Sequence, residues 1–283
     1  MNWTTLVSPE SLLPALDTPG LRIFDCRHDL AQPELAGPEA YAAGHLPGAY
    51  FLHLDRDLSG AKTGRNGRHP LPDPEVFAQT MRAFGVSEDT QVVAYDEGSG
   101  MFAARLWWLL RWIGHARAAV LDGGIAAWQK AGGLLDAAVP ASPSPGQLSV
   151  QLQDITIDAP TLLANLGAPS PVVVDARAPD RFRGENETLD PVGGHIPGAR
   201  NRFFRDNLGP DGRFKPAEAL REEWLNVLAG ASADAVVSQC GSGVTACHNL
   251  LAMELAGLRG ARLYPGSWSE WCADPQRPVA RGA

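Results

Sequence analysis

Cys240 is the residue whose setting in this sequence points most clearly to chemistry. It heads the segment 240–246, Cys-Gly-Ser-Gly-Val-Thr-Ala, whose two glycines let the backbone curl so that successive amide N–H groups point inward. Such a nest at the start of a helix attracts an anion, and a cysteine held there favours its nucleophilic thiolate form. We therefore predict that Cys240 is a catalytic nucleophile. The loop residues predicted to bind its anionic substrate are Gly241, Gly243, Val244 and Thr245.

The other three cysteines, Cys26, Cys247 and Cys272, lack this setting. We interpret them as structural, because a free cysteine is most often a small buried apolar residue. None of the four cysteines belongs to a Cys-x-x-Cys pair, so the sequence predicts no metal site.

The chain also repeats itself. Residues 25–27, Asp-Cys-Arg, recur 150 residues later as Asp-Ala-Arg, and the segment Gly-His-Leu-Pro-Gly-Ala at 44–49 recurs at the same distance as Gly-His-Ile-Pro-Gly-Ala. Gly-Ser-Gly at 98–100 recurs after Cys240, so Glu97 occupies the position of the cysteine in the first copy. A carboxylate cannot replace a thiolate as this nucleophile, so we expect only the second copy to be catalytic.

The repeat predicts two domains. The first, residues 1–138, is expected to be catalytically inactive, and the second, residues 151–283, to be catalytic. Residues 139–150 are rich in Pro and Ser and are typical of an extended linker.

Each copy is predicted to alternate strands with helices. Short apolar runs that end in Asp, at 21–25 and 172–175, are typical of buried parallel strands. Helices are expected at about 102–113 and 245–256, each stopped by a following glycine. The remaining predicted strands are 91–95, 118–121, 235–238 and 262–264. The fold class is therefore α/β, with two tandem domains that each contain a small, mostly parallel sheet flanked by helices on both faces.

Composition narrows the range of partners. The net charge of −8 argues against a nucleic-acid partner, because phosphate backbones attract Lys and Arg. The start of the chain has no basic stretch followed by an apolar run, so the sequence predicts no signal peptide. The longest apolar run, 102–113, is interrupted by Arg105 and Arg111 and is shorter than the roughly 18 residues of a membrane span. We expect a cytoplasmic protein without a membrane partner.

The loop Cys-Gly-Ser-Gly-Val-Thr-Ala, the motif Gly-His-[Ile/Leu]-Pro-Gly-Ala and the strand-ending Asp-x-Arg together resemble the rhodanese superfamily over nearly the whole chain. The resemblance implies a sulfurtransferase that carries sulfur as a persulfide on Cys240 and needs no metal or organic cofactor. It also implies a small anionic sulfur donor and an acceptor that is cyanide, a thiol or thioredoxin. The neutral Gly241-Ser242 pair is similar to 3-mercaptopyruvate sulfurtransferases, whereas thiosulfate sulfurtransferases usually carry Arg-Lys there.

The same resemblance assigns roles to further residues. Arg181 matches the arginine that holds the anionic end of the donor. The mercaptopyruvate enzymes often have a second arginine nine residues later, but this chain has Asp190 there, which would repel the donor if it pointed inward. Arg183 and Arg105 are two candidates for a replacement cation.

His69 matches a family histidine that faces the catalytic loop. With Ser242 and Asp55 it would form an Asp–His–Ser relay that delivers a proton to the departing pyruvate enolate. His45 and His195 occur in both copies, so we expect them to brace the turn around the following proline rather than to act in catalysis.

Several alternatives stay open. Thiosulfate could be the donor, or the protein could be a non-catalytic rhodanese-like binding module. Residues 98–103 fit the Gly-x-Gly-x-x-Ala pattern of dinucleotide-binding proteins, but the second copy has Tyr264-Pro265 where the acidic residue should follow. A cysteine phosphatase would need an arginine six residues after the cysteine, where this chain has Ala246.

Overall fold

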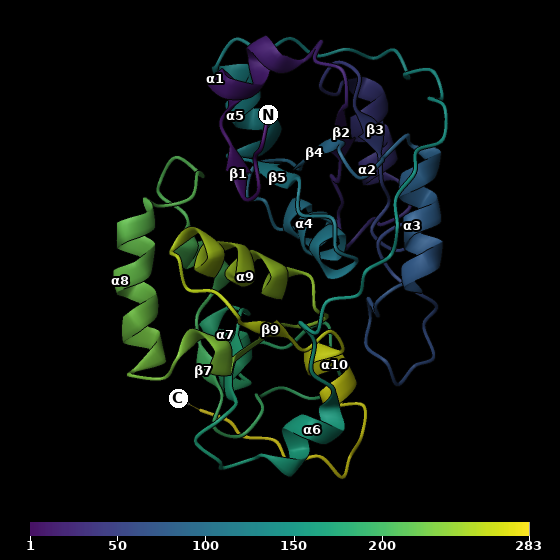
Figure 1. The fold of residues 1–283 in the computed structure, drawn as a ribbon. Coiled ribbons are helices and arrows are strands. Elements are labelled where there is room, and N and C mark those ends of the chain that lie inside the picture. The colour runs from purple at the N-terminus through teal and green to yellow at the C-terminus, as the bar shows by residue number, and fades with distance from the viewer. Residues whose placement is uncertain (283) are drawn as a thin grey trace. The chain divides into compact units, whose positions relative to one another are not determined.

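The computed structural model describes residues 1–282, and the chain divides into two compact units (Figure 1). Unit 1 comprises residues 1–60, 71–154 and 210–213. Unit 2 comprises residues 61–70, 155–209 and the described residues from 214 onward. The contiguous halves predicted from sequence do not include this exchange of short segments. The exchange matters for the site, because segment 61–70 brings Arg68 and His69 into unit 2.

Unit 1 contains a five-stranded sheet in which every pair of neighbouring strands is parallel, in the order β1-β5-β4-β2-β3. Its strands are β1 (Leu6–Val7), β2 (Leu21–Asp25), β3 (Tyr50–Phe51), β4 (Gln91–Tyr95) and β5 (Ala118–Leu121). Its helices are α1 (Pro9–Leu12), the 3-10 helix η1 (Leu13–Ala15), α2 (Ala36–Ala43), α3 (Pro74–Ala83), α4 (Ala103–Trp112) and α5 (Gly124–Lys130).

Unit 2 contains a four-stranded parallel sheet in the order β7-β6-β8-β9. Its strands are β6 (Val172–Asp175), β7 (Arg200–Asn201), β8 (Val236–Gln239) and β9 (Arg262–Leu263). Its helices are α6 (Ala159–Ala164), α7 (Pro179–Arg183), the 3-10 helix η2 (Phe204–Asn207), α8 (Ala217–Leu228), the 3-10 helix η3 (Ala233–Ala235), α9 (Thr245–Leu255) and α10 (Ser267–Trp271). The order matches β3-β2-β4-β5 of unit 1 strand for strand, which confirms the predicted duplication.

Helices cover both faces of the unit 2 sheet, as predicted. Because successive side chains of a strand point to opposite faces, β6 contributes to two separate cores. Val173 packs in a cluster with Leu162 of α6 and Trp268 of α10. Val172 and Val174 pack on the other face in a cluster with residues of α8 and α9, two helices that lie side by side (Figure 1).

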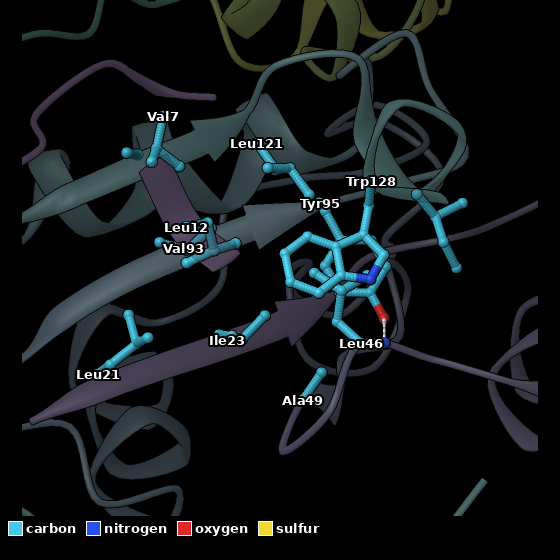
Figure 2. Packing of buried hydrophobic residues seen from close by; sticks show 12 residues of the cluster. Val7, Leu12, Leu21, Ile23, Leu46, Ala49, Val93, Tyr95, Leu121 and Trp128 are labelled. Carbon is cyan, nitrogen blue, oxygen red and sulfur yellow. Dashed lines mark hydrogen bonds between the residues drawn. The ribbon is translucent and has the colours of Figure 1, made fainter. Parts of the chain in front are cut away.

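The core of unit 1 ties the sheet to the first Gly-His-Leu-Pro-Gly-Ala segment (Figure 2). Trp128 of α5 packs there with Tyr95 of β4 and with Leu46. The Leu46 N–H donates to the Tyr95 hydroxyl at 3.1 Å, and that hydroxyl donates to the Asp25 carboxylate at 2.7 Å. The aspartate that ends β2 therefore anchors the core rather than facing solvent.

The two long helices that follow the loops end as predicted. Helix α4 stops before Gly114, whose φ is +94°, and α9 stops before Gly257, whose φ is +69°. Glycine adopts this left-handed conformation without the penalty that a Cβ imposes, so it ends each helix at a fixed point. None of the helices in residues 1–282 has the length and apolar character needed to cross a membrane.

Candidate active site

The predicted catalytic loop lies at the carboxyl end of a central parallel strand. Strand β8 ends at Gln239, Cys240 follows at once, and helix α9 begins at Thr245. The sulfur of Cys240 accepts hydrogen bonds from the backbone N–H groups of Ser242 at 3.4 Å and Gly243 at 3.2 Å. The amide nest expected from the two glycines therefore closes around the sulfur atom, where it stabilises negative charge.

Segment 264–269, which includes the start of α10, fixes the position of Cys240. The Cys240 N–H donates to the Ser267 hydroxyl at 3.1 Å, and the Cys240 carbonyl accepts from the Trp268 N–H at 2.9 Å. Gly243 has a φ of +76°, and a Cβ at this position would lie 2.3 Å from the carbonyl oxygen of Pro265. The loop therefore requires glycine here, both for its backbone conformation and for its close approach to residues 264–269.

His69 and Ser242, two residues predicted to act together, meet in unit 2. The His69 Nδ1 lies 2.8 Å from the Ser242 Oγ, and both side chains are buried. Asp55 belongs to unit 1, where its backbone N–H donates to the His53 Nδ1 at 3.1 Å. Its predicted membership of the relay stays a prediction.

Arg181, predicted to hold the donor, extends from α7 toward the catalytic loop. Its Nη2 and Nη1 lie 3.5 Å and 3.8 Å from the point where a Cβ of Gly241 would be. Its Nε and Nη2 donate to the buried carboxylate of Glu187 at 3.1 Å and 2.8 Å, and Arg177 also pairs with Glu187 at 3.2 Å. Burial raises the pKa of Glu187, but the hydrogen bonds from Arg181 and the Leu189 N–H, together with both positive charges, outweigh burial and lower it overall.

Asp190 is not an isolated negative charge beside the catalytic loop, because arginine side chains lie next to it. Its carboxylate is buried, forms an ion pair with Arg68, and has its second oxygen 3.6 Å from the Arg181 Nη2. Burial raises the pKa of Asp190 above its ordinary value, although the positive charge of Arg68 acts in the opposite direction. Of the two candidate replacement cations, Arg183 pairs with Glu185 at 2.7 Å, and Arg105 lies in unit 1, where it donates to the Leu58 carbonyl at 3.4 Å.

The corresponding loop in unit 1 is filled by a carboxylate of the protein itself. Asp96, which follows β4, is buried and accepts four backbone N–H groups. These come from Gly98, Gly100, Phe102 and Ala103, at distances of 3.1, 2.9, 2.9 and 3.2 Å. An external phosphate or sulfur anion would have to displace this internal carboxylate. The arrangement therefore argues against the dinucleotide alternative and supports the expectation that the first copy is inactive.

His45 and His195 both make bracing contacts. The Nδ1 of His45 lies 2.8 Å from the Tyr41 carbonyl oxygen, and the ring stacks on that of Tyr41 with centroids 3.9 Å apart. In the second copy, the Nδ1 of His195 lies 2.9 Å from the Phe182 carbonyl oxygen, and the two rings stack with centroids 3.7 Å apart. The two equivalent histidines therefore fix equivalent turns, in line with the interpretation from sequence.

The other three cysteines are buried and free of disulfides. Burial raises the pKa of Cys26, and it raises the pKa of Cys272 to about 11. The Cys247 thiol donates to the Gly243 carbonyl at 3.3 Å and so supports the catalytic loop from within α9. These surroundings agree with structural roles.

Sequence reasoning missed three features of this site: the position of Arg68, the role of Glu187 and the support from Ser267. Arg68 adjoins the predicted His69, and Glu187 lies six residues after Arg181, but neither spacing follows a helical or strand period that would indicate a contact. Across residues 1–282, no group of three or more His, Cys, Asp or Glu side chains is placed to hold a metal ion.

Comparisons with known proteins show the family to which the chain belongs. The family described as Rhodanese-like domain matches residues 8–131 and 158–274, one match for each copy. The chain is 50% identical over 285 residues to a Pseudomonas aeruginosa protein named "Probable 3-mercaptopyruvate sulfurtransferase", with 100% of both chains covered. A Mycobacterium tuberculosis protein named "Putative thiosulfate sulfurtransferase SseB" is 40% identical over 272 residues, covering 92% of this chain and 90% of the relative.

Among solved structures, the 3-mercaptopyruvate sulfurtransferase from Leishmania major matches with a TM-score of 0.85 and 32% identity. The match covers 97% of this chain and 75% of the other. The family match extends over both copies, and the relatives align over nearly the whole length. The chain therefore belongs to the rhodanese family of sulfurtransferases, with two rhodanese-like domains.

Proposed function

We propose that this enzyme transfers sulfur from 3-mercaptopyruvate to cyanide, a thiol or thioredoxin through a persulfide on Cys240. The observation that carries the proposal is the nest around the Cys240 sulfur, in which two backbone N–H groups lie 3.2 and 3.4 Å from Sγ. The hydroxyl of Ser242 and the ring of His69 lie beside the same loop, so nucleophile and proton source are present together.

In the first half-reaction, the Cys240 thiolate attacks the sulfur atom of the donor. A sulfur–sulfur bond forms, the donor carbon–sulfur bond breaks, and its electron pair leaves as the enolate of pyruvate. Ser242 is positioned to donate a proton to the enolate carbon and to regain one from His69 at 2.8 Å. By resemblance, Asp55 would hold the His69 ring in the orientation that this relay needs.

In the second half-reaction, the acceptor attacks the outer sulfur of the persulfide. The sulfur–sulfur bond breaks, the outer sulfur leaves with the acceptor as thiocyanate or as a new persulfide, and Cys240 returns as a thiolate. This cycle requires no metal or organic cofactor. A reducing compartment such as the cytoplasm would preserve the four free cysteines, and the net charge of −8 disfavours a nucleic-acid partner.

The neutral catalytic loop favours mercaptopyruvate over thiosulfate. Gly241, Ser242 and Gly243 add no positive charge directly after Cys240, whereas an Arg-Lys pair within the loop would suit a compact dianion such as thiosulfate. The 50% identical relative is named for 3-mercaptopyruvate. Thiosulfate remains the second candidate donor because the 40% identical relative is named for it.

Intact mass measurement after incubation with donor alone tests the proposal. The wild-type protein should gain one sulfur atom from 3-mercaptopyruvate, and Cys240→Ser should gain none. A stable sulfur on Cys240→Ser would show that another residue is the carrier. Comparison of kcat/KM for the two donors, with cyanide as acceptor, decides the donor, and no turnover with either would favour a non-catalytic binding module.

A further inference from the structure

We propose that Ser267 is a positioning residue for the sulfur chemistry of Cys240, and that the second copy keeps a serine at a strained backbone position because its hydroxyl fixes the nucleophile. Ser267 would act through the backbone of Cys240 rather than by contact with the donor. This role rests on the proposed function of Cys240 as the nucleophile, and it is independent of which donor supplies the sulfur.

The backbone of Ser267 has a conformation that serine rarely adopts. Its φ is +54°, in the left-handed region where the Cβ of an L-residue crowds the backbone. Within residues 1–282, the one other non-glycine residue with a positive φ is Ala229, which is exposed and follows the end of α8, a common place for this conformation. Ser267 is instead fully buried at the start of α10. Strain at such a position persists only where the surrounding contacts hold it, and it is typical of functional sites.

The hydroxyl of Ser267 bridges two backbone groups. It accepts a hydrogen bond from the Cys240 N–H at 3.1 Å and donates one to the Tyr264 carbonyl at 2.9 Å. The N–H of the next residue, Trp268, donates to the Cys240 carbonyl at 2.9 Å. Two consecutive residues therefore hold both polar backbone groups of the nucleophile, which fixes the direction in which Cys240 presents its sulfur to the amides of the loop.

Unit 1 contains the same turn without the serine. The carbonyl of Asp96, the residue after β4, accepts from the Ile125 N–H at 3.0 Å, just as the carbonyl of the residue after β8 accepts from α10. The residue before Ile125 is Gly124, which is therefore the equivalent of Ser267. Its φ of +58° is close to that of Ser267. The inactive copy thus has, at this position, the residue that adopts the conformation without penalty.

The turn itself does not require a side chain at this position. A Cβ at Gly124 would lie 2.4 Å from the Asp96 carbonyl oxygen and 2.8 Å from the Gly98 nitrogen, so the turn of unit 1 has no room for one. The turn of unit 2 encloses a serine side chain and tolerates its strain. Because this hydroxyl occurs in the copy that carries the cysteine, and bonds to the N–H of that cysteine, we assign it to the chemistry of Cys240.

Alkylation of Cys240 by iodoacetamide tests the assignment without any sulfur donor. The Cys240 sulfur bonds to the CH₂ carbon, iodide leaves, and peptide mass spectrometry measures the rate. Ser267→Gly and Ser267→Ala both remove the hydroxyl, so each should lower the rate constant at neutral pH by about 3- to 10-fold, the effect of losing one neutral hydrogen bond. The pH profile of the rate should also move toward higher pH in both variants, because the sulfur would be held less firmly against the loop amides.

Stability should follow a different order. Ser267→Gly relieves the strain and Ser267→Ala retains it, so the glycine variant should melt about 2–8 °C higher than the alanine variant. Their Cys240 rate constants should nevertheless be equally low. A rate constant that followed the melting temperature across wild type and both variants would overturn the proposal, because Ser267 would then have only a structural role. A normal rate constant in Ser267→Gly would overturn it as well.

Ser238→Ala is the matched control. Ser238 is also a fully buried serine, and its hydroxyl donates to the Ala246 carbonyl at 3.1 Å rather than bonding to Cys240. The Cys240 rate constant and its pH profile should stay unchanged in this variant. A decrease equal to that of the Ser267 variants would contradict the assignment, because loss of any buried hydroxyl near the loop would then have the same effect.

Sulfur transfer then separates this inference from the proposed function. If the wild-type enzyme uses 3-mercaptopyruvate, Ser267→Gly should lower kcat by about 3- to 10-fold and leave KM for the donor unchanged, because the hydroxyl holds the nucleophile and not the donor. An unchanged kcat would reject the role of Ser267 and leave the proposed function intact. Failure of the wild-type protein to gain sulfur from this donor would reject the proposed function, while alkylation of Cys240 would still decide the role of Ser267.

Discussion

Cys240 differs from the other cysteines in the groups that face its sulfur rather than in burial. All four are buried, but Cys240 receives two backbone N–H groups on Sγ, whereas Cys26 lies near the carboxylates of Asp25 and Asp96. Burial, followed by the charges of these carboxylates, raises the pKa of Cys26. The groups that face each sulfur are therefore the reason to expect Cys240, and not Cys26, to act as the nucleophile.

Cysteine labelling should reveal this difference. In Cys240→Ser, iodoacetamide at pH 8 should leave Cys272 unmodified, because burial and the charge of Asp190 raise the pKa of Cys272 to about 11. Labelling of Cys272, followed by peptide mass spectrometry, should increase only as the pH approaches that value. Rapid labelling of Cys272 at pH 8 would contradict this account.

Glu187 should contribute stability that depends on pH. Since the folded state lowers the pKa of Glu187, its contribution is complete above the unfolded pKa of about 4.3 and is lost as the pH falls through the lower folded value. Glu187→Gln should therefore reduce the free energy of unfolding by about 1.5–3 kcal/mol at pH 7, the worth of a charged hydrogen bond.

Urea denaturation of both proteins at pH 7 and at pH 3 measures the effect. The difference between wild type and Glu187→Gln should be large at pH 7 and should shrink at pH 3. Glu185→Gln is the control, because Glu185 is exposed and pairs with the exposed Arg183. A difference that stayed constant with pH would mean that the ionised carboxylate is not the source of the stability.

At the scale of elements, the catalytic loop is held by segment 264–269, which includes the start of α10, and by Cys247 of α9. The N–H and carbonyl of Cys240 bond to Ser267 and Trp268, and Gly243 packs against the carbonyl of Pro265. Gln239 is the last residue of β8 that pairs with β6. The Cys240 sulfur therefore lies just beyond the carboxyl end of the strand, where parallel sheets present their binding sites.

Gly243→Ala should disrupt this arrangement. Alanine would have to adopt the left-handed conformation of this position, which costs roughly 1–2 kcal/mol, and its Cβ would also lie 2.3 Å from the Pro265 oxygen. We expect a lower melting temperature and a large loss of sulfur loading on Cys240. Gly198→Ala is the matched control: its φ is +81°, but no atom lies within 4 Å of its Cβ position. Equal losses in both variants would indicate backbone strain alone.

At the scale of the whole molecule, the two copies carry loops at equivalent positions that surround different groups. Unit 2 holds a cysteine sulfur in its amide nest, and unit 1 holds the carboxylate of Asp96. The strand register places Asp96 itself at the position of Cys240, because Tyr95 pairs with Asp25 as Gln239 pairs with Asp175. The carbonyls of Asp96 and Cys240 also accept equivalent hydrogen bonds, from the N–H groups of Ile125 and Trp268. The sequence repeat had indicated Glu97 for this position, one residue too late, so in unit 1 a carboxylate takes the place of the cysteine.

A transplanted cysteine tests this division. Glu97→Cys in a Cys240→Ser background places a thiol directly after Asp96, whose carboxylate already uses four of the surrounding N–H groups. We expect no sulfur loading from 3-mercaptopyruvate by intact mass. Sulfur loading at the level of the wild-type protein would show that the loop of unit 1 has retained the chemistry. Cys240→Ser alone provides the baseline.

The sequence by itself determined the repeat, the parallel strands and the catalytic loop. Strands β2 and β6 have the predicted bounds, because an apolar run closed by Asp is a local pattern. The loop at Cys240 could be predicted because its conformation depends on neighbouring glycines. The pairing of Ser242 with His69 also agrees with the family resemblance, although Asp55 remains a prediction.

Only the tertiary structure decided which charges surround Arg181 and Asp190 beside the catalytic loop. The sequence predicted that Asp190 would repel the donor if it pointed inward, and it gave no indication of a contact with Arg68. The fold buries Asp190 and pairs it with Arg68, 122 residues away. An ion pair between distant segments depends on how the elements pack, and neither periodicity nor spacing along the chain carries that information. The electrostatic effect of Asp190 therefore depends on the side chains that pack against it, which only the folded structure shows.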